Sequence, residues 1–249
     1  MSNLQLLVDL HKNNYRQGPG SDDITEQILD WTDLENKTDL QVADIGCGTG
    51  ASTFVLANKL NAKITAIDLF PEFLKKLQTK AKELNLEQKI SIKAESMDDL
   101  SFAKNSLDLI LSEGAIYNMG FQKGLKYWQQ FLKTGGFIAI SEIIWLTEKR
   151  PEEIQNHWQT EYPQIDTLAN KIKILETSGF SLVNSLVLPK TAWIENYYQP
   201  LEKGFAEFLN RNNNSKEAQE ILKSEETEIK LYHKYSDYFS YGYFLARKN

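Results

Sequence analysis

The chain has 249 residues, of which 41% are hydrophobic and 25% are charged, as is typical of a globular protein with a sizeable core. The net charge of −6 argues against nucleic acid as a partner, and the single cysteine excludes an internal disulfide and a cysteine-based metal site. The sequence shows no signal-peptide pattern and no apolar run of about 18 residues, so we expect a cytoplasmic protein without a membrane partner.

Strand-like and helix-like patterns alternate between about residues 40 and 188, which predicts a doubly wound α/β fold with helices on both faces of a parallel sheet. Strands are expected at residues 40–45, 63–69, 90–94, 107–112, 137–143 and 180–188, and a last one at 238–246. Helices are expected at residues 51–60, 71–85, 121–133 and 166–178. We take the glycine pair 135–136 as the end signal of the third helix.

Three pieces fall outside this repeat and are candidates for a substrate lid. Residues 1–38 are predicted to be helical, residues 145–165 to form a polar connection, and residues 191–235 to insert two helices before the last strand. We therefore expect one domain over residues 1–249. Its parts are an N-terminal helical lid (1–38), a core (39–190), a helical insertion (191–235) and the last strand (236–249).

The most informative stretch is a turn with three glycines that follows the first strand. Gly46, Gly48 and Gly50 leave no Cβ in the way of a ligand, and the helix behind them offers free N–H groups. Asp68 ends the second predicted strand, where a carboxylate can accept both hydroxyls of a ribose. Together these features predict a cofactor that contains a nucleoside.

Two kinds of cofactor are compatible with this turn. The spacing Gly46-x-Gly48-x-x-Ala51 satisfies the loose dinucleotide fingerprint. Asp44, however, lies two positions before the first glycine, where a carboxylate suits a cationic amino-acid tail better than a pyrophosphate. The pattern Asp-x-Gly-x-Gly-x-Gly resembles the first motif of the class I S-adenosylmethionine-dependent methyltransferases.

The resemblance extends over most of the chain. The stretches Arg16–Ser21 and Ser112–Asn118, with Ala192-Trp193 and Tyr232–Tyr235, are similar to a bacterial subgroup of small-molecule methyltransferases. The resemblance implies a Rossmann-like, seven-stranded, mostly parallel sheet with an antiparallel last strand. It also implies S-adenosyl-L-methionine as cofactor and methyl transfer to a small-molecule acceptor (EC 2.1.1.-).

Two other functions stay open at this point. One is a nicotinamide-dependent reductase, and the other is a cofactor-binding regulatory protein without catalysis. A homodimer is also left open by the sequence. His11, His157 and His233 lack metal-ligand spacing, and we expect no metal site.

The resemblance and the residue types together suggest a set of site residues. The family uses residues after the third strand at the edge of the adenine, although Ser96 stands where family members often carry an acid. The polar turn after the fourth strand is expected to face the transferring methyl group. The expected cofactor-binding residues are Arg16, Asp44, Gly46, Cys47, Gly48, Gly50, Asp68, Leu69, Ser96, Met97 and Glu113.

The expected acceptor site is mostly aromatic. Its predicted residues are Tyr15, Tyr117, Asn118, Trp158, Trp193 and Tyr198. Should the acceptor need a general base, Glu113 and Tyr117 are the candidates, and Glu142 is a third.

Overall fold

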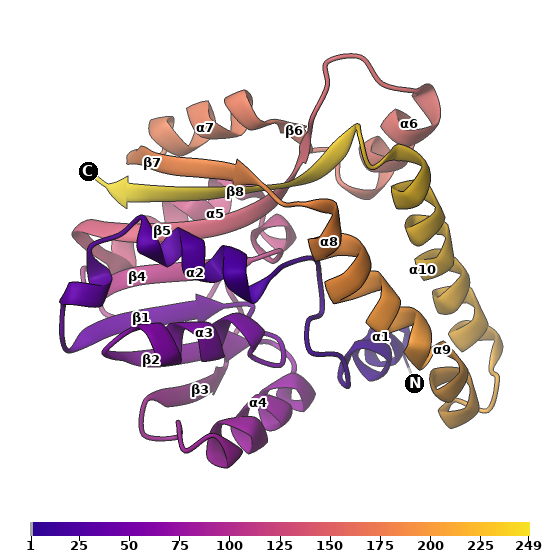
Figure 1. Cartoon of the computed structure of the whole chain (residues 1–249), viewed down its shortest axis with the longest axis horizontal. Coiled ribbons are helices and arrows are strands. Elements are labelled where there is room, and N and C mark those ends of the chain that lie inside the picture. The colour runs from indigo at the N-terminus through magenta and orange to yellow at the C-terminus, as the bar shows by residue number, and fades with distance from the viewer. Residues whose placement is uncertain (1) are drawn as a thin grey trace.

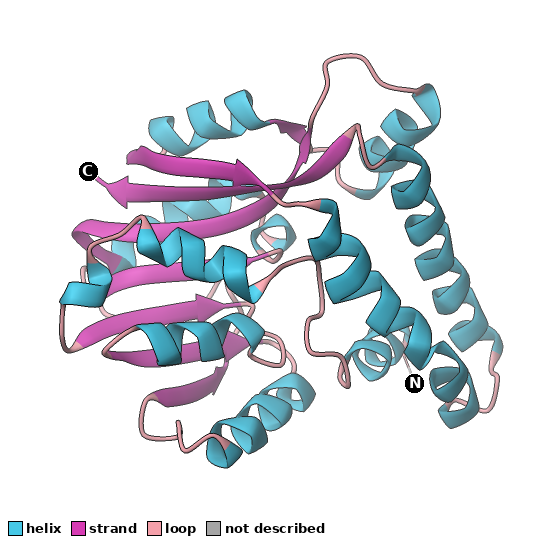
Figure 2. Cartoon of the chain, in the orientation of Figure 1, coloured by secondary structure: helices cyan, strands magenta, loops and turns pink. Residues whose placement is uncertain are grey.

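A mixed sheet lies at the centre of the computed structural model, which describes residues 2–249 (Figure 1). The strand order is β3-β2-β1-β4-β5-β8-β7. The short strand β6 also pairs with β5 but is not part of this order. Strand β8 runs antiparallel to both of its neighbours, and the other pairs are parallel (Figure 2). The strands are β1 (Leu40–Ile45), β2 (Ala62–Asp68), β3 (Ile90–Ala94), β4 (Leu107–Glu113), β5 (Leu132–Trp145), β6 (Asp166–Thr167), β7 (Phe180–Val187) and β8 (Phe239–Lys248). The predicted fold class is confirmed, including the antiparallel last strand.

Helices connect the strands and form a separate group at one end of the sheet. The α-helices are α1 (Asn3–His11), α2 (Asp22–Asp30), α3 (Ala51–Lys59), α4 (Pro71–Glu83), α5 (Phe121–Trp128), α6 (Glu152–Glu161), α7 (Leu168–Thr177), α8 (Lys190–Trp193), α9 (Gln199–Arg211) and α10 (Lys216–Tyr235). Three short 3₁₀ turns are η1 (Leu34–Asn36), η2 (Ile116–Asn118) and η3 (Gln129–Phe131). A π-helical turn, η4 (Ile194–Tyr198), joins α8 to α9.

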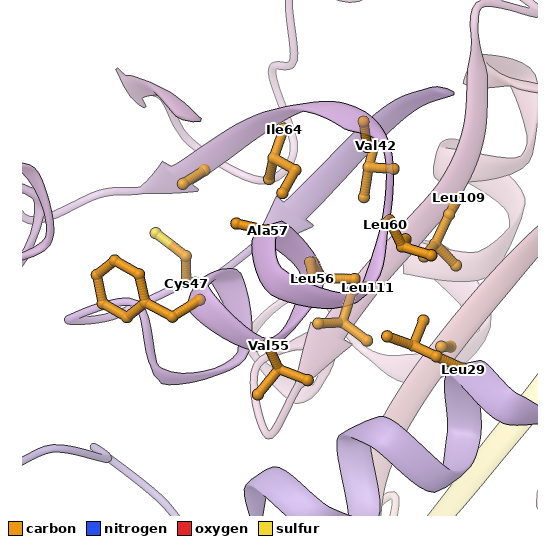
Figure 3. Close-up of a cluster of buried hydrophobic side chains, with 14 of the residues drawn as sticks. Leu29, Val42, Cys47, Val55, Leu56, Ala57, Leu60, Ile64, Leu109 and Leu111 are labelled. Atoms are coloured by element: carbon orange, nitrogen blue, oxygen red, sulfur yellow. The ribbon is translucent and has the colours of Figure 1, made fainter. Parts of the chain in front are cut away.

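One face of the sheet is covered by α2, α3 and α4. The cluster beneath them joins Val42, Ile64 and Leu111 of the sheet to Leu29 of α2 and Leu56 of α3 (Figure 3). Each such side chain stabilises the fold by about 1.5–3 kcal/mol when fully buried. The cluster fixes α3 against β1, and so holds the glycine turn between them in place.

The opposite face of the sheet is covered by α5 and α7. Leu125 and Trp128 of α5 and Leu175 of α7 pack against Ile110 and Ile138 of the central strands. Because both faces are buried, the central residues of β4, 109–111, are all apolar.

A third cluster lies beyond the carboxyl ends of the parallel strands. It contains Leu6 and Leu10 of α1, Trp158 of α6, Phe208 of α9 and Tyr232 of α10. Figure 1 shows α1, α9 and α10 together beside the sheet, and α1 contacts both of the other helices. Segments from both ends of the chain therefore form one helical layer over the strand ends.

The structure corrects two predicted elements. The helix expected at residues 121–133 ends at Trp128, and β5 already begins at Leu132. The glycine pair is part of β5. A Cβ on Gly136 would lie 3.2 Å from the backbone oxygen of Asp108, so the glycine lets β5 approach β4 closely. The connection expected at residues 145–165 contains the ten-residue helix α6.

Within residues 2–249, no helix is both long and apolar enough to span a bilayer.

Candidate active site

The glycine turn after β1 adopts a conformation that only glycine reaches easily. Gly46, Gly48 and Gly50 have φ values of +76°, +53° and +96°. A Cβ on Gly46 would lie 2.4 Å from the Cβ of Ala115, in the turn after β4. The turn after β1 and the turn after β4 are therefore in close contact at the carboxyl edge of the sheet.

Asp68 at the end of β2 reaches this glycine turn. Its carboxylate accepts hydrogen bonds from the backbone N–H groups of Gly48 at 2.9 Å and Phe70 at 3.0 Å. Burial raises the pKa of Asp68 above its usual value, although these N–H groups oppose that shift. Leu69 beside it is 57% exposed. The predicted nucleoside-binding residues Gly48, Asp68 and Leu69 are thus brought together.

Asp44, the acid before the first glycine, is almost completely buried. Its carboxylate accepts a hydrogen bond from the Thr53 hydroxyl at 2.5 Å. Burial raises the pKa of Asp44 to about 7, and the carboxylates of Glu113 and Asp68 add to this effect. A cation bound nearby would favour the ionised form of the Asp44 carboxylate, and the predicted amino-acid tail of the cofactor carries such a cation.

The segment between α1 and α2, residues 12–21, forms a strap across the glycine turn. The Gln17 side chain accepts the backbone N–H of Thr49 at 2.8 Å and donates to the Thr49 hydroxyl at 3.0 Å. The Thr49 hydroxyl also donates to the backbone oxygen of Asn14 at 3.1 Å. A Cβ on Gly48 would lie 2.1 Å from Gln17 Oε1, so this glycine also makes room for the strap.

Glu113, predicted as a cofactor ligand or general base, accepts hydrogen bonds from four side chains. Oε2 accepts from Arg16 at 2.8 Å and from Ser52 at 2.5 Å. Oε1 accepts from Thr25 at 2.5 Å and from Tyr243 at 2.9 Å. With both oxygens engaged, Glu113 lacks a free site for an acceptor proton, and the structure therefore argues against the predicted base role.

Arg16 is also committed within the protein. Its guanidinium donates to Asp22 at 2.7 Å as well as to Glu113, and the residue is 6% exposed. Arg16 was predicted to bind the cofactor. The structure instead pairs it with two carboxylates of the protein, so Arg16 and Glu113 join the strap to the end of β4.

A cavity of about 580 Å³ lies between the strap, the end of the sheet and the helical layer. This volume suits a small-molecule ligand. Its walls come from the strap, the turn after β4, α6, the α8–η4 junction, α10 and β8. The lining residues are Gln17, Gly18, Pro19, Gly114, Tyr117, Ile143, His157, Trp158, Glu161, Tyr162, Trp193, Tyr197, Glu220, Lys223, Ser224, Thr227, Glu228 and Tyr241.

The cavity contains half of the aromatic and polar residues predicted for the acceptor site. Tyr117, Trp158 and Trp193 line it. Tyr15 instead lies on the outside of the strap, where its hydroxyl donates to Asp22 at 2.7 Å. The other two are Asn118, which donates to the backbone oxygen of its own turn, and Tyr198, which is fully buried behind the cavity wall.

The remaining predicted residues are placed as follows. Met97 approaches the site of a Cβ on Gly46 to 3.8 Å, so it lies beside the glycine turn. The Ser96 hydroxyl donates to Asp98 at 2.6 Å. Cys47 is buried in the apolar cluster, and burial raises the pKa of its thiol. Glu142 forms a fully buried ion pair with Lys171 at 3.1 Å and does not line the cavity.

Several residues that build the site were missed by the sequence analysis. They are Gln17, Thr25, Ser52, Glu228 and Tyr243. Gln17 lies inside the stretch that was singled out, so its position next to Gly18-Pro19 was a usable signal. The others are ordinary residues of helices and strands, and only the fold brings them to the site.

Comparison with known proteins agrees with this geometry. Residues 42–136 match the family model described as "Methyltransferase domain". Erythromycin 3''-O-methyltransferase from Saccharopolyspora erythraea is 31% identical over 113 residues, which cover 45% of this chain and 37% of that protein. Demethylmenaquinone methyltransferase from Bacteroides fragilis is 31% identical over 105 residues, which cover 41% of this chain and 43% of that protein. These matches span less than half of the length of either relative.

The similarity of fold extends over almost the whole chain. A methyltransferase structure from Geobacter sulfurreducens, solved with S-adenosyl-L-homocysteine, superimposes with a TM-score of 0.85 at 16% identity and covers 98% of both chains. The matched segment carries the glycine turn after β1, so residues 42–136 are similar to a methyltransferase domain, and the whole chain has the fold of the Geobacter structure.

Proposed function

We propose that the chain transfers a methyl group from S-adenosylmethionine to a small molecule held in the cavity. The observation that carries the proposal is the position of the cavity beside the glycine turn. Gln17 bonds the turn and also lines the cavity, and Gly114 continues the β4 end that contacts the turn. A cofactor on the turn and an acceptor in the cavity would therefore be neighbours. The relatives named for methylating erythromycin and demethylmenaquinone support a small-molecule acceptor.

The residues present fit this cofactor. The glycine turn offers backbone that a ligand can approach closely. Asp68 would accept the ribose hydroxyls, and the buried Asp44 would favour the cationic amino group. Leu69 and Met97 are placed to contact the flat base on either side of the turn. When bound, the cofactor supplies a methyl carbon that its sulfonium has already activated.

The protein's own contribution is to hold the acceptor in line and to exclude water. Proximity and alignment alone account for much of the rate in such reactions. The Arg16–Glu113 pair keeps the strap closed over the edge of the cavity. If the acceptor must lose a proton, the groups that line the cavity include His157, Glu161, Glu220 and Glu228, and Glu113 is not among the lining residues.

Titration calorimetry tests the cofactor assignment. The protein should bind S-adenosylmethionine and S-adenosylhomocysteine and should bind NADH negligibly. Asp68→Asn should weaken the binding of both adenosyl compounds by about 1–3 kcal/mol, because charge-assisted hydrogen bonds to the ribose are lost. Unchanged affinity in this variant would remove Asp68 from the site.

Asp108→Asn is the matched control for this experiment. Asp108 lies at the opposite end of the sheet and also accepts a backbone N–H, from Gln41 at 2.9 Å. Its replacement should lower the unfolding temperature without changing cofactor affinity. If both variants lose the same affinity, the loss reflects general loosening of the sheet, and tight binding of NADH would favour a reductase instead.

A further inference from the structure

Helix α10 presents a polar stripe to the cavity. Glu220, Lys223, Ser224, Thr227 and Glu228 all line it, and their spacing of three, one, three and one places them on one helical face. Apolar residues of the same helix form an adjacent stripe that packs into the helical layer. A purely apolar ligand would leave this polar stripe unused, so the cavity wall suits a ligand with polar or charged groups.

The walls of the cavity that other elements supply are largely aromatic. Tyr117, Trp158, Trp193, Tyr197 and Tyr241 line the cavity from α6, the α8–η4 junction, β8 and the turn after β4. Aromatic rings attract a cation through the negative charge of their faces, and the attraction grows when water is excluded. Rings combined with carboxylates form the usual setting for an alkylammonium group.

The charges of the lining residues also favour a cation. Three carboxylates, Glu161, Glu220 and Glu228, line the cavity against one lysine, Lys223. Burial lowers the pKa of His157, so this residue adds no positive charge at neutral pH. Glu228 is the most enclosed of the acids, and its carboxylate accepts the Tyr198 hydroxyl at 2.9 Å. The second carboxylate oxygen of Glu228 has no hydrogen-bond partner among residues 2–249.

We propose that the acceptor pocket recognises a molecule that carries an alkylammonium group, with Glu228 opposite that group and the aromatic rings beside it. This proposal rests on the proposed methyl transfer, because it names the substrate class of the same site. It adds the charge of the acceptor, which neither the glycine turn nor the family assignment specifies.

The test uses a pair of ligands that have the same shape and differ in charge. Choline is a quaternary ammonium with a hydroxyl, and 3,3-dimethyl-1-butanol is its neutral carbon counterpart. The protein is first saturated with S-adenosylhomocysteine, whose binding is measured separately, and each ligand is then titrated by calorimetry. Choline should bind at least about tenfold more tightly than the alcohol, because only the cation gains from the rings and the carboxylate. This comparison needs no variant.

Two glutamate variants locate the effect on α10. Glu228→Gln keeps the shape and the bond from Tyr198 but removes the charge, and it should reduce the preference for choline by about tenfold. Glu217→Gln, in the first turn of the same helix and outside the cavity lining, should leave the preference unchanged.

The outcomes separate this inference from the proposed function. If S-adenosylhomocysteine binds but choline is no better than the alcohol, the cationic acceptor is wrong and the cofactor assignment stands. Equal loss of preference in both glutamate variants would place the effect in the general charge of α10 rather than in the pocket. If S-adenosylhomocysteine itself fails to bind, the proposed function is the one that falls.

Discussion

At the scale of single residues, Glu113 shows that a side chain can lie where the sequence predicts and still be engaged by partners that the sequence does not reveal. The sequence places a carboxylate directly after an apolar parallel strand, where ligands bind in this type of sheet. The structure confirms that position, but the four donors to Glu113 come from Arg16, Thr25, Ser52 and Tyr243. These partners are spread over almost the whole chain, so no local pattern could reveal that both oxygens are occupied.

Glu113→Gln tests this structural role. The amide has the same shape, but it replaces one accepting oxygen with a donor and leaves Arg16 without half of its charge compensation. We expect the free energy of unfolding, measured by urea denaturation, to fall by about 3 kcal/mol, as is typical when one partner of a buried pair is removed. Glu207→Gln, in an exposed pair with Arg211, is the control and should change stability very little. A Glu113 variant as stable as the control would contradict the role.

At the scale of elements, the strands were easier to predict than the layer that covers their ends. Runs such as Leu107–Ser112 are apolar and bounded by turn residues, so their local sequence is sufficient. Residues 121–133 were misjudged because a glycine pair can end a helix or permit close strand contact, and only the β4 neighbour decides between them. The polar stripe of α10 was missed because it resembles an ordinary exposed helix face.

The strap, residues 12–21, is the element whose dynamics can be tested. Gln17→Ala removes its hydrogen bonds to Thr49, so amide hydrogen exchange over residues 14–20 should become faster in the free protein. Gln122→Ala, on the exposed side of α5, should leave this exchange unchanged. In the unmodified protein, S-adenosylhomocysteine should slow exchange in the strap, as expected of a lid that closes over the cofactor. Equal exchange rates over residues 14–20 in the Gln17 variant and in the unmodified free protein would mean that Gln17 does not hold the strap.

At the scale of the whole molecule, the ligand space lies between the sheet and a helical layer whose helices the sequence predicts but whose packing it does not. The cavity draws its walls from residues between Gln17 and Tyr241. Such long-range placement depends on how α1, α9 and α10 pack together, and this packing has no periodic signature in the sequence. The positions of the strands and the glycine turn could therefore be anticipated, whereas the strand order and the shape of the acceptor pocket required the structure.

Two buried acids, Asp44 at the end of β1 and Glu228 on α10, make the stability of the free protein depend on pH. Burial raises the pKa of Asp44 to about 7, and it raises the pKa of Glu228 to about 7 as well. At Glu228, the nearby acids Glu225 and Glu161 add to this shift, and His11 opposes it. Between pH 4 and 7 the folded state holds protons on these groups that the unfolded state has already lost.

The sign of the pH effect follows directly from this difference in bound protons. As pH rises from about 4 to 7, the free energy of unfolding should fall by up to about 1 kcal/mol per pH unit for each of the two groups. Asp44→Asn and Glu228→Gln should each flatten this slope in urea denaturation series measured at several pH values. Asp98→Asn is the control, because the pKa of Asp98 is lowered and its titration ends below this range. If the slope between pH 5 and 7 is the same in all four proteins, neither buried acid holds a proton in the folded state.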